Sequence, residues 1–76
     1  NMAENTGIIE VGKLYRLLVG LDRLLPIDAV FLVLDCVILD HVVRIKIITD
    51  KGVTATMNTS KESYDALATM WFEPLS

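Results

Sequence analysis

Residues 29–39 read AVFLVLDCVIL, and this stretch decides the fold. As a strand, it would carry apolar side chains on both faces, except at Asp35. As a helix capped by Asp28, it would be apolar on nearly every side. Five of its eleven residues are valine, isoleucine or phenylalanine, which favours the strand. In both alternatives the element needs apolar cover on every side.

The segment before this stretch has the pattern of an amphipathic helix. Its valine and leucine residues recur at spacings of three and four, which would place them on one helical face. These residues are Val11, Leu14, Leu18, Leu21 and Leu25. Pro26 follows the last of them and is typical of a helix end. With Asn5 or Thr6 as the cap and Glu10 in the first turn, we predict a helix that ends at Leu25.

The segment after the stretch has the pattern of a β-hairpin. Two runs, VRIKI and VTATM, alternate apolar side chains with charged residues or threonine. Residues 50–52 (DKG) supply a three-residue loop, in which glycine can adopt the left-handed conformation of a bulged turn. That loop pairs Ile45 with Met57, so one register places every apolar side chain on the same face. We predict an antiparallel hairpin over residues 42–58.

A second helix is predicted directly after the hairpin. Thr59 and Glu62 have the spacing of a capping box, in which each side chain bonds the backbone of the other residue. Pro74 closes the element. One apolar stripe follows the cap, formed by Tyr64, Leu67, Ala68 and Trp71.

Together these elements predict one small α+β domain over residues 8–76, because 76 residues allow no second domain. The favoured order is α-β-β-β-α, with the helices packed on one face of the sheet, and the alternative is α-α-β-β-α. Asn1 ahead of Met2 is typical of a residue left by tag cleavage. Residues 1–7 are therefore expected to be a tag scar and a flexible N-terminus.

The apolar central element predicts self-association. Two helices can cover one face of a three-stranded sheet but leave the other face exposed, and monomers seldom expose large apolar patches. We expect a homo-oligomer, most simply a two-fold dimer, or an obligate partner protein, with the interface at Phe31, Val33, Asp35 and Val37. An aspartate within an apolar run is costly to bury alone, so Asp35 would be paired or would set the register of that interface.

Composition leaves little material for catalysis or for cofactor binding. The chain has one cysteine and one histidine, and it lacks a glycine-rich phosphate loop. Asp35, Cys36, Asp40 and His41 lie close in sequence, but a strand would divide them between its two faces. We expect no enzyme activity, no metal and no cofactor. Charged residues interrupt the apolar stretches, so no membrane span is expected, and the single cysteine favours a cytoplasmic location.

These observations favour a non-enzymatic module for protein–protein interaction and oligomerisation, such as an adaptor, a regulator or an inhibitor, including viral or phage accessory proteins. The expected partners are a second copy and another protein. The alternative is a nucleic-acid-binding dimer with a basic sheet face and a basic first helix. That alternative would use Lys13, Arg16, Arg23, Arg44 and Lys46. A formal net charge of −3 weighs against it.

Overall fold

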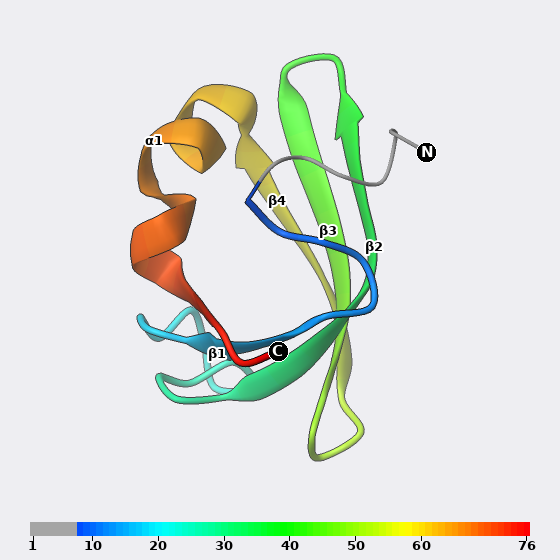
Figure 1. The fold of residues 1–76 in the computed structure, drawn as a ribbon, viewed down its shortest axis with the longest axis vertical. Coiled ribbons are helices and arrows are strands. Elements are labelled where there is room, and N and C mark those ends of the chain that lie inside the picture. Colours follow the sequence, from blue (N-terminus) through cyan, green and yellow to red (C-terminus); the bar gives the residue numbers. More distant parts are fainter. Residues whose placement is uncertain (1–7) are drawn as a thin grey trace.

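The computed structural model describes residues 8–76, and the tag scar and flexible N-terminus predicted for residues 1–7 lie outside the described part. Five strands form one antiparallel sheet in the order β4-β3-β2-β1-β5, and a single helix lies between the last two strands of the chain (Figure 1). The elements are β1 (Leu14–Leu17), β2 (Val30–Leu39), β3 (Val42–Thr49), β4 (Thr54–Ser60), α1 (Lys61–Trp71) and β5 (Phe72–Pro74).

The predicted fold class is wrong, because the order is β-β-β-β-α-β and the described part of the chain has one helix. Residues 11–25 form β1 and the start of a long loop instead of a helix. Backbone pairing on both sides of β1, with β2 and with β5, replaces the helical hydrogen bonds. Within the loop, the Asp22 carboxylate accepts the amides of Leu24 and Leu25 at 2.8 and 3.0 Å. This local turn competes with a helix.

The apolar stretch forms the central strand β2, so the alternative order α-α-β-β-α is also wrong. β2 pairs with β1 through its first half and with β3 along nearly its whole length. Its register with β3 shifts by one residue between Val33 and Asp35, where Leu34 is the extra residue of a β-bulge. Because side chains alternate along a strand, this single residue reverses which face the later side chains occupy.

The predicted hairpin is confirmed, with its register. Ile45 lies opposite Met57, and Lys46 lies opposite Thr56. The amide of Thr49 donates to the Val53 carbonyl at 2.8 Å and closes the loop. Gly52 has a φ of 80°, the left-handed conformation that this loop requires and that glycine adopts without steric cost.

The predicted second helix is confirmed as α1, but its cap and its end differ from the prediction. Ser60, and not Thr59, is the N-cap, and its side chain accepts the Ser63 amide at 3.0 Å. The helix ends at Trp71, and the chain continues as β5 against β1.

The core lies between the concave, inner face of the sheet and α1 (Figure 1). Phe31 is at its centre, with its ring centroid 5.9 Å from that of Tyr15 and 5.7 Å from that of Phe72. The Tyr64 hydroxyl accepts the buried Ile9 amide at 2.9 Å and ties the helix to the start of the described chain. The largest fully buried side chains are those of Ile9, Leu17, Phe31, Val33, Cys36, Val43, Ile45, Ile47 and Tyr64.

Ionisation of the Tyr15 phenol is expected to destabilise this core at alkaline pH. Burial raises the pKa of the Tyr15 phenol above its usual value of 10.0. The unfolded chain therefore loses this proton at a lower pH than the folded chain, so stability is fully present below pH 10 and falls as pH rises above it. In urea titrations from pH 8 to pH 12, we expect Tyr15→Phe to show a smaller alkaline loss than the wild type. Tyr64 is present in both proteins, so it contributes equally to their alkaline loss of stability. An equal total loss in the two proteins would therefore contradict the role given to Tyr15.

Candidate interaction surface

The outer face of the sheet carries an apolar strip over its three central strands. Leu14, Leu32 and Ile48 lie side by side in one row across β1, β2 and β3. Leu34 and Val37 continue the strip along β2. Leu34 and Leu14 are 47% and 41% exposed, and the other three are partly buried. We call these five residues, Leu14, Leu32, Leu34, Val37 and Ile48, the outer strip.

The outer strip contains a hollow and is bordered by charges of both signs. A shallow hollow of about 140 Å³ lies among side chains that include those of Leu14, Leu32 and Ile48. Asp35 and Lys46 lie opposite each other in the β2–β3 register, and neither forms an ion pair within residues 8–76. The Asp35 carboxylate accepts the amide of the next residue at 3.0 Å. The Asp35 carboxylate is therefore partly buried on the outer face, beside apolar side chains, and the Cys36 amide is its hydrogen-bond donor.

The β-bulge separates the four residues predicted for the interface. Phe31 and Val33, before the bulge, are 1% exposed and lie in the core. Asp35 and Val37, after it, lie on the outer face with partial exposure. The sequence reasoning missed Leu32 and Leu34, because strict alternation placed them on the opposite face from Asp35. Asp35 is the signal that could have identified Leu32 and Leu34 as outer residues. Strict alternation would direct its carboxylate into the core beside Phe31 and Val33, so a break in the alternation was to be expected near it.

The five cations considered for nucleic-acid binding do not form one patch. Arg16 is bound to Glu73 of β5 by an ion pair, which raises the pKa of the arginine. Arg23 lies in the loop after β1, and Lys13 immediately precedes β1. Only Arg44 and Lys46 share a strand and a face, and Arg44 donates a hydrogen bond to Asn58.

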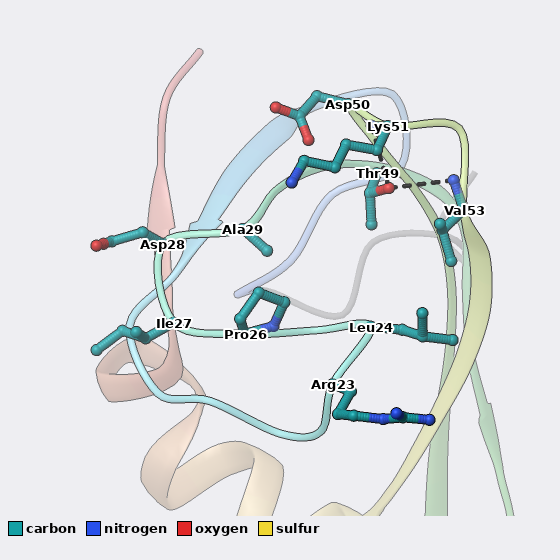
Figure 2. A pocket seen from close by; sticks show the side chains of 10 residues that line it. All are labelled: Arg23, Leu24, Pro26, Ile27, Asp28, Ala29, Thr49, Asp50, Lys51 and Val53. Carbon is teal, nitrogen blue, oxygen red and sulfur yellow. Dashed lines mark hydrogen bonds between the residues drawn. The ribbon is translucent and has the colours of Figure 1, made fainter.

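A second hollow lies between the loop that precedes β2 and the β3–β4 hairpin (Figure 2). Its volume is about 280 Å³. Arg23 and Lys51 bring positive charge to it, and Asp28 and Asp50 bring negative charge. The Thr49 hydroxyl also lines this hollow. It accepts a hydrogen bond from the Val53 amide at 3.1 Å and so stabilises the hairpin loop. The lining also includes Leu24, Pro26, Ile27 and Ala29.

The residues considered for metal or thiol chemistry are dispersed. Cys36 is fully buried in the core, whereas Asp35 is on the outer face. Asp40 and His41 form the exposed turn between β2 and β3, where Asp40 has a φ of 63°. Within residues 8–76, no three histidine, cysteine, aspartate or glutamate side chains lie close enough to hold a metal ion.

Comparisons with protein-family models, curated proteins and solved structures found no match to this chain. Among residues 8–76, the structure has no helix with the length and apolar character that crossing a membrane requires.

Proposed function

We propose that this protein is a non-enzymatic interaction module that self-associates, with the outer strip of one copy docked on the outer strip of a second copy. The observation that carries the proposal is the uneven cover of β2. This strand has apolar side chains on both faces, but α1 and the neighbouring loops cover only the inner face. The outer apolar side chains gain free energy when a second surface removes them from water.

The composition of the strip supports a second copy as the occupant. A two-fold axis places the same surface on both sides of the contact, so the surface must complement itself. Apolar side chains at the centre of the strip meet apolar side chains of the second copy. Asp35 can meet the second copy's Lys46 while Lys46 meets the second copy's Asp35. These reciprocal pairs would fix the orientation and register of the dimer, a role that polar groups fill in other apolar interfaces.

Lysine substitution within the strip tests the proposal. We expect Leu34→Lys to weaken self-association at least a hundredfold, because it would bury a new charge without a partner. The matched control is Met70→Lys, which places the same side chain at an apolar residue of α1 that is 58% exposed. Light scattering after size exclusion measures the mass of each variant, and circular dichroism checks that each is folded.

The proposal predicts that Leu34→Lys approaches the single-chain mass of 8.5 kDa while Met70→Lys keeps the mass of the wild type. Leu14→Lys provides a second variant of the strip on another strand. If both strip variants keep the wild-type mass and remain folded, a second copy does not dock on this surface.

A further inference from the structure

Within residues 8–76, strand β4 has one edge that no other strand covers. It pairs with β3 on one side and is the last strand of the sheet on the other. Two hydrogen bonds bracket the β3–β4 ladder, from the Thr49 amide to the Val53 carbonyl and from the Lys61 amide to the His41 carbonyl. The odd-numbered residues of β4 therefore bond to β3, because hydrogen-bonded pairs alternate in antiparallel strands. The backbone groups of Thr54, Thr56 and Asn58 point away from the sheet.

The opposite edge of the sheet, at β5, offers almost no donors. The Phe72 amide donates to the Ala68 carbonyl and completes the end of α1. Pro74 has no amide hydrogen. Head-to-tail pairing of β4 with the β5 edge of another copy therefore lacks donors on one side. A copy that pairs through β4 must meet the same strand of its partner.

We propose that two copies join their β4 strands edge to edge in an antiparallel pair centred on Thr56, forming one continuous sheet. The inference rests on the proposed self-association and adds a second contact, which joins a copy to a different neighbour from the one docked on its outer strip. Ser60 is the N-cap of α1, so its carbonyl already accepts a helical hydrogen bond. Thr54, Thr56 and Asn58 thus remain for pairing. The register that uses all three places Thr56 opposite the second copy's Thr56, and Thr54 opposite the second copy's Asn58.

The side chains of β4 suit this register. Residues 54–60 contain no charged side chain and no proline, the usual means by which sheet edges avoid pairing. On the outer face, threonine lies beside threonine, a pair that stabilises sheets. On the inner face, Ala55 lies beside the second copy's Met57, and both are partly buried already. The two Lys46 side chains stand three strand spacings apart, about 14 Å, which exceeds the screening length at physiological salt.

Single-cysteine variants test the register directly. The Cα atoms of a hydrogen-bonded antiparallel pair are about 5.5 Å apart, within the range of a disulfide. With oxidised glutathione as the oxidant, two thiols become one disulfide while the reagent is reduced to its thiol form. We expect Thr56→Cys to form a covalent dimer and neither Thr54→Cys nor Asn58→Cys to do so alone. A mixture of Thr54→Cys and Asn58→Cys should cross-link. The wild type is the control for Cys36, which is buried.

A proline variant tests the same edge without cross-linking. Proline is tolerated on an edge strand where the amide faces solvent, so Thr56→Pro should keep the fold while it removes the two central hydrogen bonds between copies. We expect at least a tenfold loss of the edge contact, measured by light scattering in a Leu34→Lys background at protein concentrations well above those at which Leu34→Lys is a single chain. In that background the outer strip no longer contributes, so failure of this proposal is separate from failure of the proposed function. Cross-linking of Thr54→Cys alone, or no cross-linking of Thr56→Cys, would overturn the register.

Discussion

Replacing Phe31 by alanine is expected to lower the free energy of unfolding by about 3 to 5 kcal/mol, the usual cost of removing a buried phenylalanine. Phe31 is 1% exposed and contacts the rings of Tyr15 and Phe72. The matched control is Leu32→Ala, one residue further along the same strand. Leu32 faces outward, so its loss should cost less than about 1.5 kcal/mol in the isolated chain.

Urea unfolding followed by the fluorescence of Trp71 measures both variants. The titrations belong in the Leu34→Lys background, because self-association of the native state would otherwise add to the apparent stability. Equal costs for Phe31→Ala and Leu32→Ala would show that the first half of β2 does not have its side chains in the orientation described.

Deletion of Leu34 is expected to retain the native fold. Without the extra residue the ladder between β2 and β3 has no bulge, and strict alternation keeps Val33 and Cys36 on the inner face and Asp35 on the outer face. An unpaired carboxylate turned into an apolar core would cost several kcal/mol, comparable to the whole stability of a small domain, and the deletion avoids this cost because Asp35 stays outside. Leu34→Ala keeps the residue count and should retain the fold. Circular dichroism and the dispersion of amide NMR signals measure the outcome.

A second variant tests the position of Asp35 after the deletion. Because Asp35 stays on the outer face when Leu34 is removed, Asp35→Val in the deletion background should change the free energy of unfolding little. A Leu34 deletion that fails to fold, and that Asp35→Val rescues, would contradict this account of the bulge.

The hairpin could be predicted from sequence because two kinds of pattern agree there. The alternation in both strands and the Asp-Lys-Gly loop each specify the same register, in which Ile45 meets Met57. The second helix was predicted for a similar reason, since a capping-box pattern at Thr59 and Glu62 comes just before an apolar stripe, although the observed cap is Ser60. Local signals suffice where the decisive contacts are close in sequence.

The first helix was predicted wrongly because the leucines of residues 11–25 fit two structures. Their spacing suits a helical face, but Tyr15 and Leu17 also alternate as in a strand, and both are buried in the sheet. The decision depends on pairing of β1 with β2 and with β5, and β5 lies almost sixty residues further along the chain. No local pattern reports such a partner, so tertiary pairing overrides the helical spacing.

The sequence indicated an uncovered apolar surface on β2, but it did not indicate which side chains of β2 form that surface. Reading β2 as apolar on both faces led to an uncovered apolar surface, and the outer strip is that surface. Strict alternation then placed Phe31 and Val33 on the same face as Asp35. One bulge at Leu34 reverses this assignment for the second half of the strand. A bulge has no fixed sequence signature, although an aspartate within an apolar run indicates where alternation would fail.

The mass of the wild-type protein in solution tests self-association most directly. Light scattering after size exclusion, over a range of concentrations and at two salt levels, gives this mass without calibration. We predict at least twice the single-chain mass of 8.5 kDa, with dissociation on dilution, and the same dissociation at higher concentration for Leu34→Lys. A mass of 8.5 kDa at every concentration and at both salt levels would contradict the proposal that a second copy covers the outer strip.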